Sequence, residues 1–484
     1  MKPVFGVAAI REAEEAAFAL GEPARSDLVT FELVETSALM LRAASGLAGV
    51  IDSELRRAGT HRAEVLIAAG PGNNGGDALW AGAMLARRGV GVSVWRTAGT
   101  AHMEGWAALQ GAGGVEVDAI SAIRMLGEVD LVVDGVLGIG GRGGLPEGVG
   151  TFARACRDVG VRVVAVDLPS GLEGDSGEVS EAFTADVTVT FGGYKPCLVM
   201  EPAASRCGCV ELVDIGLEFG TADMEAWDES DVAARWPFPG PMSDKYSRGV
   251  VGIDAGSVQY PGAAVLSCLG ASYAGAGMVR YIGAARDAVI SALPNIVLAE
   301  GRVQSYVIGS GWGERLGGES DVAGILATGI PAVVDAEAIG MLPRHRLGER
   351  VLLTPHAGEL ARLLGVSREE VVSDPVSAVR EAAASSGAVV LLKGASQYVA
   401  TPAGRVTLAV PGPAWTAQAG SGDVLAGTCG ALLAAGLGAR EAALAGASVQ
   451  ALAARATPGP IPPQDLARRF PEIIAAWTGQ PTRW

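Results

Sequence analysis

The sequence predicts an α/β protein of two successive domains, each built around a largely parallel sheet. Its 484 residues suit two to three domains at roughly 150 residues each. Short, uninterrupted apolar stretches alternate with helical stretches in both halves, and this pattern stops between residues 217 and 240. Fully apolar strands separated by helices are typical of a parallel sheet that is covered on both faces.

In the first domain, residues 1–216, apolar stretches of four to five residues (about one short strand each) are expected to be strands. They are 65–69, 92–95, 131–134, 163–167, 187–190 and 210–213. Residues 78–88 are expected to form a helix. In a parallel sheet, ligands bind beyond the carboxyl ends of the strands, and Asp134 and Asp167 stand at two of those ends.

Residues 217–240 are acidic and then rich in proline, which indicates a connection between domains. In the second domain, residues 241–484, we expect strands, a hairpin and small-residue helices. The strands are 250–253, 306–309, 332–335, 351–354 and 389–393, the hairpin joins 398–400 to 406–408, and the helices are 262–276, 424–435 and 439–454.

Composition excludes several classes of partner. A formal net charge of −16 repels nucleic-acid backbones and anionic lipids, so we expect neither nucleic acid nor a membrane as partner. No apolar run reaches the roughly 18 residues of a transmembrane helix, and charges come too early for a signal peptide. Cys207 and Cys209 do not have a zinc-site spacing. We therefore expect a cytoplasmic protein with reduced cysteines, and a homo-oligomer.

Three glycine-rich loops follow strands in the first domain. Residues 70–77 read Gly-Pro-Gly-Asn-Asn-Gly-Gly-Asp, 134–144 begin with Asp and are rich in glycine, and 166–172 read Val-Asp-Leu-Pro-Ser-Gly-Leu. Glycines let backbone N–H groups turn toward a phosphate, and asparagine and aspartate oxygens suit a hard cation. Alternatively, these side chains only cap a helix or satisfy turn N–H groups. Convergence of three such loops on one rim favours a site.

On these motifs, residues 1–216 resemble the NAD(P)H-hydrate epimerase family. The resemblance implies a Rossmann-like, doubly wound sheet that binds NADHX or NADPHX, the hydrates of NADH and NADPH, together with K⁺. Asp167 would contact the hydrated nicotinamide and shuttle a proton. The implied dinucleotide contacts are Asn73, Asn74, Gly75, Gly76, Asp77, Gly138, Ile139, Gly140, Gly141, Arg142, Gly143, Gly144 and Asp167, and the implied K⁺ ligands are Asn74, Asp134 and Ser170.

Two details of this half fit less closely. Ala78 stands where the family often has glycine, and residues 190–196 are a weaker match. Lys195, within that stretch, is equally well interpreted as a solvated loop residue.

In the second domain, residues 418–427 open an apolar helix with Gly420-Ser421-Gly422-Asp423. The glycines can turn N–H groups toward an anion, and Asp423 can take a proton from a hydroxyl as a phosphoryl group arrives. An N-cap role is the alternative for Asp423. Solvation at a strand end is the alternative for Lys393, and a hydrogen bond within a loop is the alternative for His356.

Residues 240–460 resemble the ADP- or ATP-dependent NAD(P)H-hydrate dehydratases, which implies a ribokinase-like α/β fold. Ala263, Gly311, His356 and Asp423 would contact the S epimer. Lys393, Gly394, Ala395, Ser396, Gln397 and Gly422 would bind ADP or ATP, with Mg²⁺ on its phosphates. The sequence departs from the family in residues 254–257, Asp-Ala-Gly-Ser, where two glycines usually precede the serine, and at Ser310 and Ala357, where proline is common.

Together the two halves predict a bifunctional enzyme of nicotinamide nucleotide repair, an isomerase and lyase that epimerises NADHX and NADPHX and dehydrates the S form. One alternative is a ribokinase-like small-molecule kinase with an N-terminal ligand-binding module. Another is that the N-terminal half binds a ligand or a protein without catalysis. The sequence leaves open ADP or ATP, and NADHX or NADPHX.

Overall fold

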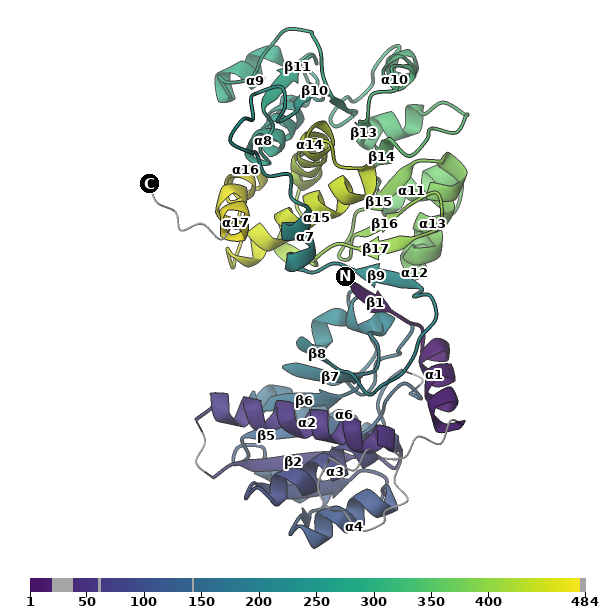
Figure 1. The fold of residues 1–484 in the computed structure, drawn as a ribbon, viewed down its shortest axis with the longest axis vertical. Coiled ribbons are helices and arrows are strands. Elements are labelled where there is room, and N and C mark those ends of the chain that lie inside the picture. The colour runs from purple at the N-terminus through teal and green to yellow at the C-terminus, as the bar shows by residue number, and fades with distance from the viewer. Residues whose placement is uncertain (20–37, 60–61, 142, 479–484) are drawn as a thin grey trace. The chain divides into compact units, whose positions relative to one another are not determined.

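The computed structural model describes residues 1–19, 38–59, 62–141 and 143–478 (Figure 1). The chain divides into two compact units. One comprises Pro3–Asp223, and the other comprises Met224–Trp484 together with Met1–Lys2. Both units are α/β, which confirms the predicted fold class.

The N-terminal unit holds a seven-stranded sheet in which all neighbouring strands pair in parallel. Across the sheet the order is β4 (Val115–Glu116), β3 (Gly91–Arg96), β2 (Glu64–Ala69), β5 (Leu131–Gly135), β6 (Arg162–Val166), β7 (Val187–Phe191) and β8 (Cys209–Val213). The strand order reverses between β2 and β5, so the loops that follow these strands diverge there. Such a switch point leaves a crevice for a ligand.

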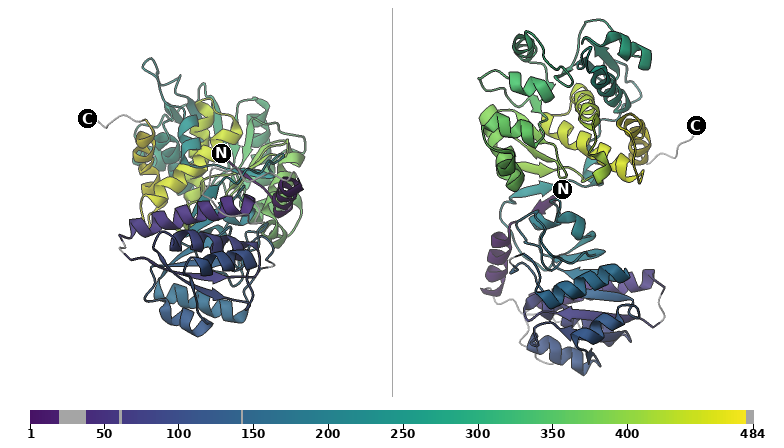
Figure 2. Two further views of the ribbon diagram at one scale, coloured as in Figure 1. Left: turned by 60° about the horizontal axis from the view of Figure 1, so that its bottom comes forward. Right: turned by 180° about the vertical axis from the view of Figure 1, so that it is seen from behind.

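Alternating residues of these strands face two separate cores. Val65 and Ile67 of β2 pack with α2 (Ala38–Arg57), α3 (Asn73–Ala86) and α4 (Met103–Gly111). Leu66 of β2 packs instead with α5 (Ala119–Met125) and α6 (Glu147–Val159). The purple α2 and the adjacent α3 lie together on one face (Figures 1 and 2). The sheet is therefore covered on both faces, as predicted. The remaining elements of this unit are α1 (Val7–Ala19), η1 (Pro196–Leu198) and η2 (Ala204–Arg206).

The C-terminal sheet has ten strands and is parallel at its centre. Its order is β1 (Lys2–Val4), β9 (Met224–Ala226), β17 (Val406–Leu408), β16 (Tyr398–Ala400), β15 (Val389–Leu392), β14 (Val351–Leu353), β13 (Ala332–Val334), β12 (Ser305–Ile308), β10 (Val250–Asp254) and β11 (Met278–Tyr281). The β16–β17 hairpin is antiparallel, as expected from its turn. Here the strand order reverses at β10 and β12.

Two closely packed helices lie at the centre of this unit, α8 (Pro261–Tyr273) and α14 (Ser421–Ala434). A Cβ added at Gly427 would lie 1.9 Å from the carbonyl oxygen of Ser267, and one added at Gly270 would lie 2.2 Å from that of Val424. Only glycine permits this reciprocal approach. The apolar core also takes in α15 (Ala439–Arg455). Figure 1 shows α11 (Ala357–Leu364) and α13 (Pro375–Ser386) across the sheet from α14 and α15.

The remaining helices of the C-terminal unit are shorter. They are α7 (Glu229–Arg235), α9 (Arg286–Ala292), α10 (Gly318–Ala327), η3 (Ala336–Met341), α12 (Arg368–Ser373), η4 (Ala414–Thr416), α16 (Pro463–Arg468) and α17 (Phe470–Trp477). No helix in the described ranges is both long and apolar enough to cross a bilayer.

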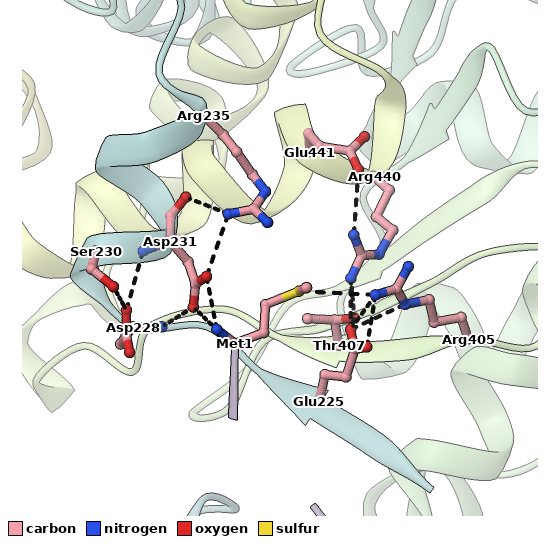
Figure 3. A network of polar contacts seen from close by, with 10 residues as sticks. All are labelled: Met1, Glu225, Asp228, Ser230, Asp231, Arg235, Arg405, Thr407, Arg440 and Glu441. Atoms are coloured by element: carbon pink, nitrogen blue, oxygen red, sulfur yellow. Dashed lines mark hydrogen bonds and ion pairs between the residues drawn. The ribbon is translucent and has the colours of Figure 1, made fainter. Parts of the chain in front are cut away.

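Part of the stretch 217–240 is itself folded, because β9 and α7 belong to the C-terminal unit. Three of its acidic side chains, Glu225, Asp228 and Asp231, lie in a network of polar contacts (Figure 3). Glu225 accepts hydrogen bonds from Arg405 at 2.7 Å and from Arg440 at 2.9 Å. Asp228 is the N-cap of α7, and Asp231 completes its capping box and forms an ion pair with the amine of Met1 at 2.8 Å. Arginines distant in sequence explain why an acidic stretch that looks like a connection is ordered here.

Candidate active sites

In the N-terminal unit, the loops after β2 and β5 meet at the switch point. A Cβ at Gly70 would lie 1.9 Å from the carbonyl oxygen of Val136, and a Cβ at Gly75 would lie 2.0 Å from that of Gly70. Helix α3 begins at Asn73, and its N-cap residue Gly72 provides no side-chain hydrogen bond. The first N–H groups of α3 therefore remain available to an anionic ligand.

The three predicted K⁺ ligands gather beneath these loops. Ser170 donates from its hydroxyl to Asp134 Oδ1 at 2.6 Å and from its backbone N–H to Asp134 Oδ2 at 2.8 Å. Asn74 donates to the carbonyl oxygen of Val166 at 2.7 Å and, more weakly, to that of Leu137 at 3.3 Å. Burial raises the pKa of Asp134 to about 6, although its hydrogen bonds to Ser170 oppose the shift.

This set of groups fits a hard monovalent cation. It contains carboxylate, hydroxyl, amide and main-chain carbonyl oxygens and no soft ligand. A Cβ at Gly138 would lie 2.3 Å from Asn74 Oδ1, so only glycine leaves room beside that oxygen.

The Asp167 carboxylate is held by a buried lysine. Asp167 has a φ of 68°, an unfavourable conformation for a residue other than glycine that is often found at functional sites. Its Oδ1 atom forms an ion pair with Lys195 and accepts a hydrogen bond from Thr190 at 3.2 Å. Lys195 is only 1% exposed, so the interpretation of this lysine as a solvated loop residue is wrong.

Two further acids lie near this pair. Burial, followed by the charges of Asp167 and Glu14, holds the pKa of Asp77 well above its usual range. Burial and then the charge of Asp167 also raise the pKa of Glu14, on α1. Among the described residues, Asp77 has no hydrogen-bond or ion-pair partner, and it lies beyond the first turn of α3. Asp77 is therefore not a helix cap.

The glycine loop after β5 joins the same rim. Gly144 donates from its N–H to the carbonyl oxygen of Gly171 at 2.8 Å, which connects the second and third predicted loops. Arg11 of α1 donates to the carbonyl oxygen of Ile139 at 3.1 Å. Arg142 lies outside the described residues. Glu14 and Arg11 were not predicted as site residues, because nothing in the pattern of α1 distinguishes them from solvated charges.

In the C-terminal unit, Asp423 lies in the first turn of α14. The N-cap is Gly420, with a φ of 93°, and no side chain caps the helix. The capping interpretation of Asp423 is therefore wrong. Its carboxylate has no hydrogen-bond or ion-pair partner within the described part of the chain. Burial and then the charge of Asp335 raise the pKa of Asp423 to about 7, which suits a general base near neutral pH.

Lys393 lies beside Asp423 rather than in solvent. Its Nζ atom is 2.6 Å from Asp335 Oδ1 and would be 3.4 Å from a Cβ added at Gly422. In the loop that Lys393 begins, Gly394 and Ala395 are exposed, whereas Ser396 is buried. Of the predicted nucleotide contacts, Lys393 and Gly422 are therefore neighbours at the start of α14.

A cleft of about 1030 Å³ opens at the β10–β12 switch point. Gly256, Tyr260 and Trp312 line it, and Arg315 stacks over Trp312 at 4.0 Å from the ring centroid. The predicted contacts Ala263 and Gly311 adjoin it, since a Cβ at Gly311 would lie 2.5 Å from that of Ala263 and 3.3 Å from that of Tyr260. Trp312 belongs to a strand-end loop that the sequence places on this rim, whereas Arg315 was not predicted. Arg315 is held there by two 2.9 Å hydrogen bonds to the Asp254 carboxylate.

His356 has a local structural role as well. Its Nδ1 atom accepts hydrogen bonds from the N–H groups of Gly358 at 3.0 Å and Glu359 at 3.2 Å, which caps α11. Its side chain is 56% exposed. The other ring nitrogen, Nε2, takes no part in the cap. It lies 3.4 Å from a Glu359 oxygen, on a side chain that a ligand can reach.

Comparisons with known proteins support both halves. A family model described as NAD(P)H-hydrate dehydratase matches residues 251–471, and one described as YjeF-related protein N-terminus matches residues 36–197. The bifunctional NAD(P)H-hydrate repair enzyme Nnr of Mycobacterium tuberculosis is 45% identical over 411 residues, covering 82% of this chain and 84% of that protein. The enzyme of the same name from Mycobacterium leprae is 44% identical, covering 90% and 89%.

Among solved structures, the ADP/ATP-dependent NAD(P)H-hydrate dehydratase of Bacillus subtilis, co-crystallised with ATP and Mg²⁺, has 25% sequence identity and a TM-score of 0.49. The match covers 52% of this chain and 99% of the Bacillus subtilis protein. The two relatives with the same name extend over both units at 44% and 45% identity. The chain therefore belongs to the family of bifunctional NAD(P)H-hydrate repair enzymes.

Proposed function

We propose that the N-terminal unit interconverts the R and S epimers of NADHX and NADPHX, and that the C-terminal unit dehydrates the S epimer using ADP or ATP. One observation carries the proposal. In the N-terminal unit the carboxylate of Asp167, in the loop after β6, forms an ion pair with Lys195. In the C-terminal unit Asp423 lies near Lys393, whose own ion-pair partner is Asp335.

In the epimerase site, the free N–H groups of α3 and the 138–144 loop hold the phosphates and ribose of the dinucleotide. The carboxyl group of Asp167 gives a proton to the C6 hydroxyl, which leaves as water while the ring nitrogen supplies its electron pair. The Asp167 carboxylate then stabilises the positive charge on the ring and takes the proton back when water adds to the other face. Asn74, Asp134 and Ser170 would hold K⁺, which would supply a fixed positive charge next to the dinucleotide.

In the dehydratase site, Ala263, Gly311 and His356 position the S epimer, while Lys393–Gln397 and Gly422 bind the nucleotide. Asp423 takes the proton of the C6 hydroxyl while the hydroxyl oxygen attacks the terminal phosphorus of the nucleotide. The ring nitrogen then expels phosphate and restores NADH or NADPH. Mg²⁺ bound to the nucleotide would neutralise phosphate charge.

Product analysis tests this function. The protein is incubated with S-NADHX, ADP or ATP, and Mg²⁺, and products are separated by chromatography. We expect NADH and free phosphate in equal amounts. A stable phosphorylated product would instead indicate a small-molecule kinase. Running ADP and ATP, and NADHX and NADPHX, in parallel identifies the preferred pair.

We also propose that the protein acts in the cytoplasm as a homo-oligomer, without nucleic-acid or membrane partners. Cysteines that are all free suit a reducing compartment, and the net charge of −16 disfavours polyanions. Met103, Val115 and Ile120 are more than half exposed and offer an apolar surface for self-association. Light scattering after gel filtration tests the oligomer, and cell fractionation tests the compartment.

A further inference from the structure

Asp335 is a buried anion with every oxygen engaged by the protein. It follows β13 and is 2% exposed. Its Oδ1 atom accepts from Lys393 at 2.6 Å and from Thr354 at 2.8 Å, and its Oδ2 atom accepts from Ser310 at 2.7 Å. Although burial opposes ionisation, the Lys393 ammonium and these hydrogen bonds lower the pKa of Asp335. Because Asp335 is 2% exposed, its carboxylate is shielded from a substrate.

Ser310 makes this arrangement particular to the present chain. It occupies a loop position where the dehydratases that the chain resembles commonly have proline, which has no side-chain donor. The Ser310 hydroxyl gives Asp335 an additional hydrogen bond from β12's loop, opposite Thr354 after β14. Hydrogen bonds from the ends of β12 and β14 thus hold the Asp335 carboxylate at the end of β13, which lies between them.

Lys393 transmits the position of Asp335 to the reacting groups. Its side chain is 19% exposed. Its Nζ atom lies next to Gly422 in the first turn of α14. The charged groups that act on Lys393 are Asp335, Glu359 and Asp423. Those that act on Asp423 are Asp335, Lys393 and Glu337. Asp335 is common to both sets.

We propose that Asp335 is a positioning residue for dehydration, which fixes the Lys393 ammonium beside Asp423 where the nucleotide phosphate arrives. This inference rests on the function proposed for the C-terminal unit. During the reaction, a bond forms between the C6 oxygen and the terminal phosphorus, and the bond from that phosphorus to the nucleotide oxygen breaks. The hydroxyl proton goes to Asp423, and the Lys393 ammonium offsets the charge that develops on the leaving oxygen. Asp335 acts through Lys393 and contacts no reacting atom.

The test is a double-mutant cycle of Asp335→Asn, Lys393→Met and both together in the full-length protein. Steady-state kinetics are measured with S-NADHX, Mg²⁺ and the nucleotide that the wild type uses. Asp335→Asn should lower kcat/KM for the nucleotide about 10–100-fold, the usual loss when a partner that orients an acting group is removed. The double variant should be no worse than Lys393→Met alone. Losses that multiply would show that Asp335 acts independently of Lys393 and overturn the proposal.

The pH profile is a second readout that a merely structural role would not change. Removing the negative charge of Asp335 lowers the pKa of Asp423, so the acid limb of kcat/KM should move to lower pH. Removing the positive charge of Lys393 should move it to higher pH. Acid limbs that stay at the wild-type position in both variants would contradict the proposal.

Ser310→Ala keeps both charges and removes one hydrogen bond, so it serves as the milder variant if Asp335→Asn does not fold. It should lower kcat/KM by less than Asp335→Asn, and this loss should vanish in the Lys393→Met background. An undiminished loss in that background would again refute the inference. If the wild type itself fails to dehydrate S-NADHX, the proposed function fails instead, which keeps the two failures distinct.

Discussion

The pH dependence of dehydration provides a quantitative test of Asp423 as the base. Burial and the nearby charge of Asp335 raise the pKa of Asp423 to about 7, and a base must be deprotonated to act. At about pH 6 roughly a tenth of the enzyme has this base free, and at about pH 8 roughly nine-tenths does, so kcat/KM should rise about tenfold. An unperturbed aspartate, with a pKa of about 3.9, would produce almost no rise over this range.

The assay follows the absorbance of the reduced nicotinamide ring as NADH forms from purified S-NADHX, with a blank that lacks enzyme at each pH. Asp423→Asn is the matched control, because its residual rate should show no such rise. A wild-type rate that is flat between about pH 6 and pH 8, or that falls as pH increases, would refute the reasoning.

Other predictions address each unit separately. Asp423→Asn should abolish dehydration and leave epimerisation intact, as measured by chromatography of the two epimers. Lys195→Met should slow epimerisation at least about a hundredfold, because it leaves the buried charge of Asp167 uncompensated. It should also lower the free energy of unfolding of the N-terminal unit by about 3–5 kcal/mol. An unchanged urea denaturation curve would contradict this prediction. Gly427→Ala should cost about 3 kcal/mol or more by forcing α14 away from α8, whereas Gly324→Ala, in open space on α10, should stabilise by about 0.4–1 kcal/mol. Thermal unfolding measures both, and equal Tm values would count against the packing argument. Replacing K⁺ with a bulky organic cation should slow epimerisation but not dehydration.

The strands of both sheets were predictable because most are buried on both faces and are therefore continuously apolar. Residues 131–134 and 389–393 are examples, and β5 and β15 lie there. Other strands were missed. Met278–Tyr281 contains an arginine, and β9 contains Glu225, so neither has an apolar run. The latter is ordered by Arg405 and Arg440, whose proximity depends on the tertiary fold.

The glycine-rich loops of the candidate sites were predictable, because the residues that form each loop are adjacent in the sequence. Glycine is required where backbones approach, as at Gly70 and Gly75, and such glycines stand out in a sequence. By contrast, the partner of a buried charge is set by topology. The pairing of Lys195 with Asp167, and that of Lys393 with Asp335, joins residues 28 and 58 positions apart. A single sequence cannot distinguish these lysines from solvated ones.

The most direct test follows an equal mixture of R- and S-NADHX with ADP or ATP, Mg²⁺ and K⁺ until the absorbance stops changing. The wild type should convert the whole mixture to NADH. Asp167→Asn should convert the S half rapidly and then slow to the uncatalysed rate of epimerisation, and adding Asp423→Asn protein should restore full conversion. Wild-type protein that stops at the S half, or two variants that fail to complement each other, would contradict two independent sites acting in turn on one damaged coenzyme.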